Sequence, residues 1–274
     1  GLTLTGNYTG FETMTIADNA VTFGAGSSLD PLNSVILSGA NSALTISDLA
    51  AFSSAGVMLS DGTSLTSDSD TVIQAVSLSM GAANLQGDIQ LDNNGGAWTL
   101  GTTGGATVID GNIDGGDNSW TAAITGANGI TFNGTIADFG AMSILTNTSD
   151  VNGAIQDFTS LVIGGTMDIT DASNLGQGGD GTITLIDGAT LLTDADTTID
   201  TDLTLDDGAG FGASTDVDLA DNGTLTFTGI VPGTQVIGQN ITDISDVMVN
   251  IAGGEINFTG TLSGMDSLAV NGGT

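Results

Sequence analysis

The 274-residue sequence contains no lysine, arginine, histidine or cysteine. Without histidine or lysine the usual general bases near neutral pH are missing, and without lysine or arginine no fixed cation can hold a phosphate group. Without cysteine or histidine the chain has no thiolate nucleophile, no ordinary zinc site and no disulfide bond. The sequence therefore predicts that the protein is not an enzyme and requires no cofactor.

Positive charge is missing altogether, whereas 32 acidic residues give a formal net charge of −32. Nucleic acids and anionic membrane surfaces bind proteins largely through lysine and arginine, so neither is an expected partner. The chain also lacks an apolar run of about 18 residues, so no membrane insertion is expected. Carboxylate oxygens suit Ca²⁺, which is the natural counterion for this composition.

Aromatic residues make up only 4% of the chain and proline occurs twice, whereas glycine occurs 43 times. Hydrophobic residues reach 39%, and the chain is long enough to bury a large core. The core is therefore expected to be aliphatic, and the chain is expected to turn often.

A short pattern recurs along the sequence: an apolar residue, two others, an apolar residue, one other and a third apolar residue. Most neighbouring copies begin about 21 residues apart, a spacing typical of repeat architectures. The two long gaps, from Ile73 to Phe139 and from Phe158 to Ile244, are close to three and four repeats. The copies begin at Phe11, Leu32, Phe52, Ile73, Phe139, Phe158, Ile244 and Met265.

Within each copy apolar and polar residues alternate with a period of two, which is typical of strands with one buried face. Turn pairs such as Asp61-Gly62 and Asn133-Gly134 separate these runs. A fixed period of short strands predicts an all-β parallel β-solenoid with coils of about 21 residues, continuous over 1–274 and expected to be part of a longer chain or filament. A β-sandwich of repeats is the alternative. The expected inward ladder passes through Ile16, Leu37, Val57, Leu78, Ile144, Ile163, Val249 and Val270.

Three segments carry a family resemblance: Gly223-Thr224-Leu225-Thr226-Phe227-Thr228-Gly229, Gly254-Glu255-Ile256-Asn257-Phe258-Thr259-Gly260 and the run from Met265 to Thr274. This pattern resembles the passenger repeats of autotransporters and related bacterial adhesins. The resemblance implies a secreted right-handed parallel β-helix and carries no catalytic residues. Ordinary passengers contain basic residues, and this chain departs from them in having none.

A first candidate calcium site is Asp110-Gly111-Asn112-Ile113-Asp114-Gly115, which matches the first half of a calcium loop. Asp110, Asn112 and Asp114 would supply oxygen ligands, and Asp117 or Asn118 would supply another. The alternative is an ordinary turn between two strands.

A second candidate site comprises Asp194, Asp196, Asp200 and Asp202. Residues two apart in a strand share a face, so each of the two pairs would place like charges close together and favour a bound cation. The alternative is a solvated acidic face.

Both ends of the sequence are strand-like, and neither offers a helix, a proline cluster or a charged plug as a cap. An uncapped solenoid end presents unpaired backbone groups to another strand. We therefore expect a structural protein, extracellular or at the cell surface, that forms a filament, a surface layer or an adhesin stalk by head-to-tail self-assembly. The alternative is a calcium-dependent adhesin module that binds carbohydrates or surfaces, including cell-surface glycans.

Overall fold

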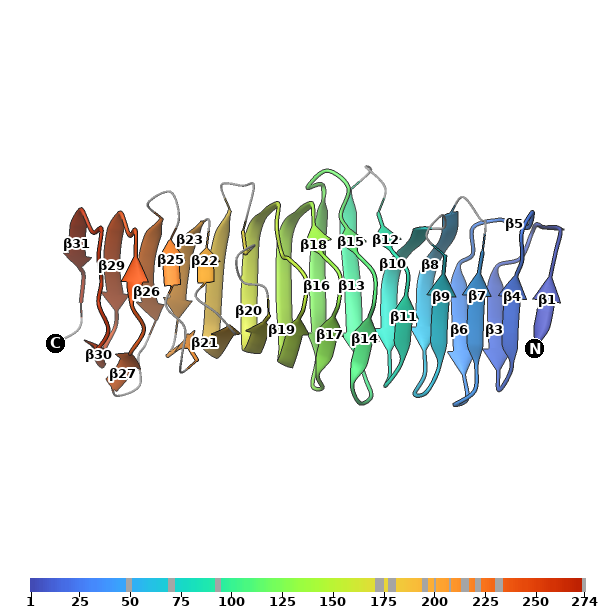
Figure 1. Cartoon of the computed structure of the whole chain (residues 1–274), viewed down its shortest axis with the longest axis horizontal. Helices are drawn as coiled ribbons and strands as arrows, with labels where there is room; N and C mark the ends of the chain where they lie inside the picture. Colours follow the sequence, from blue (N-terminus) through green and yellow to red (C-terminus); the bar gives the residue numbers. More distant parts are fainter. Residues whose placement is uncertain are drawn as a thin grey trace. The chain divides into compact units, whose positions relative to one another are not determined.

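The computed structural model describes residues 1–47, 51–68, 72–91, 95–170, 175–176, 181–193, 197–199, 201–206, 208–212, 217–219, 223–229 and 234–272. Over these residues every regular element is a β-strand (Figure 1). The same residues include no helix with the length and apolarity of a membrane span. The chain divides into two compact units, Gly1–Phe139 and Gly140–Thr274. The expectation of one continuous solenoid over 1–274 stays a prediction.

The first unit is built from short strands that follow one another at close intervals. Their bounds are β1 Leu2–Leu4, β2 Asn7–Tyr8, β3 Thr13–Ala17, β4 Ala20–Phe23, β5 Ser28–Leu29, β6 Ser34–Ser38, β7 Ala43–Ile46, β8 Ala51–Leu59, β9 Ser64–Ser67, β10 Val72–Met80, β11 Asn84–Gln86, β12 Ile89–Gln90, β13 Gly96–Thr102, β14 Thr107–Ile109, β15 Ile113–Asp114, β16 Trp120–Gly126, β17 Ile130–Phe132 and β18 Ile136–Ala137.

Strand β19, Phe139–Val151, begins at the final residue of the first unit. The second unit continues with β20 Phe158–Ile169, β21 Thr182–Thr193, β22 Thr197–Ile199, β23 Asp202–Asp206, β24 Gly210–Phe211, β25 Val217–Leu219, β26 Thr224–Gly229, β27 Thr234–Ile237, β28 Ile241–Thr242, β29 Asp246–Ile251, β30 Glu255–Phe258 and β31 Ser267–Val270.

Strands of the first unit pair in parallel with strands about one repeat further along the chain. The stacks are β3–β6–β8–β10–β13–β16, β1–β4–β7–β9–β11–β14–β17 and β10–β12–β15–β18, with β2 on β5. Thr13 lies beside Ser34, and Gly96 lies beside Trp120, each one coil further on. Parallel pairing at this spacing confirms a β-solenoid with coils of roughly 21 residues, and the β-sandwich alternative is wrong.

The second unit repeats this arrangement. Its stacks are β20–β21–β23–β26–β29–β31, β22–β25–β28 and β27–β30, with β24 beside β21. Thr182 pairs with Asp202, whereas Thr224 pairs with Asp246, which lies slightly further along the chain from its partner. Coil length therefore varies a little at the corners while the strands keep their stacks.

The core consists of columns of aliphatic side chains that point inward from stacked strands. In the first unit one column runs through Val21, Leu44, Leu65, Leu85, Ile109 and Phe132. Its members from Leu44 to Phe132 are each at most 1% exposed. Alternation along each strand places apolar residues inside and polar residues outside, as the period of two predicts.

The predicted inward ladder is confirmed in its face and corrected in its register. The prediction placed Val57 next to Leu37 in the ladder. In the structure Leu37 pairs with Leu59, and Val57 pairs with Val35, so the predicted register is wrong by two residues at this step. A slip of two keeps the same face of a strand, so both side chains are still buried. At the other end of the ladder Val249 is half-buried and Val270 is 60% exposed.

Candidate functional site

The first predicted calcium group occupies a corner of the first unit, where the chain passes from β14 to β15. Asn133 donates a side-chain hydrogen bond to Oδ1 of Asp110, and the backbone N–H of Thr135 donates to Oδ1 of Asn112 at 2.9 Å. Oδ1 of Asp114 accepts the N–H of Gly116 at 2.7 Å. These oxygens thus connect turns within and between neighbouring coils.

No group of three or more acidic side chains that could hold a metal ion occurs within the described part of the chain, which includes Asp110, Asp114 and Asp117. Asp114 also accepts a hydrogen bond from Gln90, one coil earlier, at 3.3 Å. Hydrogen bonds between coils therefore give Asp110 and Asp114 a structural role at this corner. Calcium binding by Asp110, Asn112, Asp114 and Asp117 stays a prediction.

The second predicted calcium group is described only at one member. Asp194, Asp196 and Asp200 lie outside the described residues. Asp202 begins β23, is exposed, and its Oδ1 accepts the N–H of Thr224 in the next coil at 2.7 Å. The role seen for Asp202 is again to bridge adjacent coils.

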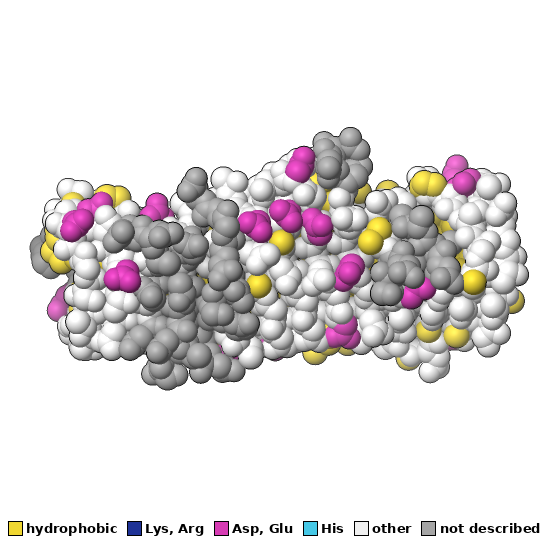
Figure 2. Space-filling view, turned by 45° about the horizontal axis from the view of Figure 1, so that its top comes forward, with side chains coloured by type: hydrophobic (Ala, Val, Ile, Leu, Met, Phe, Trp, Pro, Cys, Tyr) yellow, Lys and Arg dark blue, Asp and Glu magenta, His cyan; other side chains and the backbone are white. Residues whose placement is uncertain are grey.

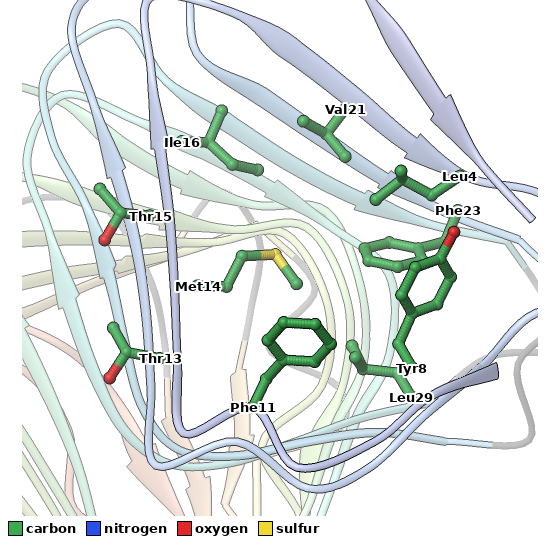
Figure 3. A pocket seen from close by; sticks show the side chains of 10 residues that line it. All are labelled: Leu4, Tyr8, Phe11, Thr13, Met14, Thr15, Ile16, Val21, Phe23 and Leu29. Carbon is green, nitrogen blue, oxygen red and sulfur yellow. The ribbon is translucent and has the colours of Figure 1, made fainter.

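The first coil of the first unit, residues 2–17 with strands β1, β2 and β3, has an open apolar interior. A pocket of about 380 Å³ lies there, lined by Leu4, Tyr8, Phe11, Thr13, Met14, Thr15, Ile16, Val21, Phe23 and Leu29 (Figure 3). Tyr8 packs edge-on against Phe23 with ring centroids 5.6 Å apart, and Phe11 lies 6.5 Å from Tyr8. In Figure 3, Met14 points toward the aromatic rings, whereas Thr13 and Thr15 lie on the opposite side of β3.

Two apolar side chains of the first coil are more than half exposed to solvent. Leu2 is 53% exposed and Phe11 is 54% exposed. β1 pairs only with β4, and β3 pairs only with β6, among the described strands. Among the described strands, none lies along the other edge of β1 or β3.

Apolar side chains are also exposed in the last described coil of the second unit, which comprises residues 255–270 with β30, Leu262 and β31. Leu268 is 57% exposed, Val270 is 60% exposed and Met265 is 41% exposed. Within the described residues β31 pairs with β29 and with no further strand. In both coils the exposed apolar side chains lie on the side where the described residues place no neighbouring coil.

A second hollow in the first unit is lined by residues of β8 and β10, among others. This groove has a volume of about 450 Å³ and includes Asn33, Ser53, Gln74, Val76 and Trp120 in its lining. Val76 is 41% exposed, whereas Trp120 is only 6% exposed. Sequence reasoning missed this groove because its lining comes from several different coils, and no local motif joins them.

On the face drawn in Figure 2, acidic side chains occur in several separate places, and no basic side chain is seen. In the described strand registers each acidic residue faces an uncharged one: Asp206 faces Thr228, Asp246 faces Ser267 and Asp114 faces Ala137. Like charges directly opposite destabilise strand pairs. In the strand pairs that the structure describes, carboxylates therefore do not lie directly opposite each other.

Comparison with protein-family models, with curated proteins and with solved structures yields no match.

Proposed function

We propose that the protein is a structural building block that associates with itself head to tail by the stacking of coils. The observation that supports this proposal is the parallel stacking of successive coils in each unit, in which Thr13 lies beside Ser34 in one and Thr224 lies beside Asp246 in the other.

Association by coil stacking suits the composition of the chain. Parallel strands join through backbone hydrogen bonds and need no basic side chain. A contact between two different faces of identical subunits produces an open filament unless the rotation closes a ring. A head-to-tail filament, a surface layer or an adhesin stalk follows from such a contact.

An extracellular or cell-surface location is part of the proposal. It is supported by the resemblance of the repeats to passenger repeats of autotransporters and related adhesins. It is also supported by the absence of lysine and arginine, because proteases that cut after basic residues have no site in this chain.

The test is sedimentation velocity combined with electron microscopy of the purified 274-residue chain, over a series of salt concentrations. We expect oligomers that lengthen as salt rises, because a subunit of charge −32 repels its own copies most strongly at low ionic strength. A chain that stays monomeric at every salt concentration would contradict the proposal.

A second candidate function is favoured by the groove over β8 and β10. Its lining combines an indole, two side-chain amides and hydroxyl groups around apolar surface, a mixture typical of small-molecule and sugar sites. Glycan-array binding with and without calcium tests this adhesin alternative. Gln74→Ala and Asn33→Ala should each weaken a genuine signal, whereas Asn7→Ala, outside the groove, should leave it unchanged.

A further inference from the structure

We propose that the groove over β8 and β10 binds an uncharged, extended oligosaccharide, longer than one sugar ring, that lies across these two coils. This inference rests on the second candidate function, glycan binding at the groove, and does not depend on self-association. It names the class of ligand and the side chains that select it.

The groove exists because successive coils turn differently at this corner. In β10 the chain advances five residues from Ile73 to Leu78, whereas their partners in the next coil, Ile89 and Leu100, are eleven residues apart. The coil that follows β10 therefore has a longer corner, and Gly95 of that corner lines the groove. Irregular segments held by a rigid scaffold are common places for binding sites.

The next coil along has an equally long corner and contributes Trp120 to the wall of the groove. Gly96 pairs with Trp120, and a Cβ atom at Gly96 would lie 2.8 Å from the six-membered ring of the indole. Glycine within a strand suits such a close approach. The missing side chain at Gly96 thus leaves room for the indole beside the preceding coil, where it lines the groove.

The lining of the groove includes side-chain amides that the protein itself does not use. Neither Asn33 nor Gln74 makes a side-chain hydrogen bond to any residue that the structure describes. By contrast, Gln90 donates a side-chain hydrogen bond to Asp114 in the next coil at 3.3 Å. A primary amide offers two donors and an acceptor, so the two free amides suit the hydroxyl groups of a sugar.

Charge favours a neutral ligand. The residues that line the groove include no acidic side chain, and the whole chain has no basic one. An anionic ligand would approach a subunit of net charge −32 with no cation to pair with it. A cationic ligand or a bridging Ca²⁺ would find no carboxylate in the lining. Binding at the groove is therefore expected to be independent of calcium.

The pairing of the floor strands favours a sugar over an extended peptide. β8 lies between β6 and β10, and β10 also pairs with β12 and β13, so the floor has no free strand edge to which a peptide could add. Recognition must come from side chains. Pro31 is exposed and Val76 is 41% exposed, and they offer apolar surface to the C–H face of a sugar ring beside the amides.

The positions of the two amides set the length of the ligand. Leu32 forms a bridge with Ser54, which pairs with Ala75, so these three residues lie on successive coils. Asn33 follows the first of them and Gln74 precedes the last, which places the two Cα atoms about 12 Å apart. A single sugar ring is too short to contact both amides. The groove volume of about 450 Å³ lies within the range of small-ligand sites.

The test is a titration of the full 274-residue chain with neutral β-1,4-linked trisaccharides: cellotriose, chitotriose, mannotriose and xylotriose. Glucose is the short control and trigalacturonate is the anionic control. Tryptophan emission gives the readout, because Trp120 lines the groove whereas Trp98, the only other tryptophan, is fully buried. We expect at least one neutral trisaccharide to bind tightly relative to glucose and to trigalacturonate, with equal affinity in calcium and in chelator.

Substitutions locate the site. Gln74→Ala and Asn33→Ala should each lower the affinity for that trisaccharide by about fivefold, through the loss of a hydrogen bond. Both should unfold at the wild-type denaturant midpoint, since neither amide has a partner among the described residues. Gln86→Ala and Asn84→Ala, which remove exposed amides outside the groove, are the matched controls and should leave the affinity unchanged.

Each part of the inference has an outcome that overturns it. Equal affinity for glucose would overturn the extended ligand, and equal affinity for trigalacturonate would overturn the neutral one. Unchanged binding in both Gln74→Ala and Asn33→Ala would remove the site from the groove. A glycan-array signal with no binding by the four trisaccharides would overturn this inference and leave glycan binding standing. No glycan signal of any kind would refute the second candidate function as well, whereas self-association is measured separately by sedimentation.

Discussion

Val247 in β29 and Leu268 in β31 occupy the same position of consecutive coils, yet they differ completely in exposure. Val247 is fully buried, whereas Leu268 is 57% exposed. Both side chains point toward the core, and the difference is the presence of another coil beyond β29. Burial of a side chain in this fold therefore depends on coils one repeat away. An interior coil is covered by a neighbour on each side, whereas a coil with one neighbour is covered on one side only.

The largest effect is expected where interior coils touch through their backbones. A Cβ atom added at Gly111 would lie 1.9 Å from the carbonyl oxygen of Gly87, and a Cβ at Gly134 would lie 2.3 Å from the carbonyl oxygen of Gly111. Gly111→Ala should lower the free energy of unfolding by about 4 kcal/mol, because the backbone of the neighbouring coil must shift. Chemical denaturation measures the change.

Gly101→Ala is the matched control for that substitution. A Cβ at Gly101 meets no atom within 4 Å. The control should therefore be neutral or slightly stabilising, since alanine restricts the unfolded chain. Similar losses at Gly101 and Gly111 would show that close coil contact is not the cause.

The next largest effect on the free energy of unfolding is expected for a buried side chain, and an exposed side chain in the same column provides the comparison. Leu225, Val247 and Leu268 stack in register, and Leu225 is fully buried. Leu225→Ala should reduce the free energy of unfolding by about 3 kcal/mol through lost burial and a residual cavity. Leu268→Ala should cost well under about 1 kcal/mol in the monomer, because most of that side chain is already in water.

The same pair of variants separates folding from association. Leu268→Ala should weaken oligomers in sedimentation, whereas Leu225→Ala should leave the association of the folded chain unchanged. An equal loss of stability in the two monomers would contradict the view that a neighbouring coil, and not the leucine itself, provides the stabilisation.

The fold was predictable because both the 21-residue repeat and the alternation of apolar and polar residues are visible in short stretches of the sequence. The apolar positions at Ile16, Leu37, Leu78 and Ile163 all face the core as expected. The exact register was not predictable, since a slip of two positions at Val57 preserves the alternation and is decided by corner length. Corner length in turn depends on contacts between coils.

The candidate calcium residues illustrate a second limit of the sequence. The spacing of Asp110, Asn112 and Asp114 is that of a calcium loop, but the same spacing suits a solenoid corner. Only the stacked coils reveal that Asn133 and Thr135 use these oxygens. A local motif does not indicate which residues lie beside it one repeat away. A calcium loop and a solenoid corner therefore cannot be distinguished from this stretch of sequence.

A smaller effect is expected from hydrogen bonds that aromatic side chains make to the backbone. Nε1 of Trp98, in a fully buried ring, donates to the carbonyl oxygen of Ala75 at 2.9 Å, whereas the hydroxyl of Tyr8 donates to the carbonyl oxygen of Thr5 at 3.3 Å in an exposed setting. Trp98→Phe should cost about 2 kcal/mol, because it loses the buried hydrogen bond and some packing. Tyr8→Phe, in the first coil, should change the unfolding midpoint little, and a comparable loss there would remove the distinction between interior and end coils.

The smallest effect concerns the acidic residues that connect coils. Oδ1 of Asp202 accepts the backbone N–H of Thr224 at 2.7 Å, so Asp202→Ala should cost about 1 kcal/mol or less at this exposed site. Asp202→Asn keeps an oxygen acceptor in the same place and removes the charge. In chelator we expect Asp202→Asn to unfold at nearly the wild-type denaturant midpoint, which would assign the role of Asp202 to hydrogen bonding between coils.

The same three proteins in calcium test the other hypothesis for this residue. If the cluster around Asp202 binds Ca²⁺, wild type should gain stability that both variants lack, because asparagine is a weaker calcium ligand than a carboxylate. If calcium changes the stability of wild type and of Asp202→Asn equally, Asp202 is not a calcium ligand. Its role would then be the hydrogen bond that it accepts from Thr224 in the neighbouring coil.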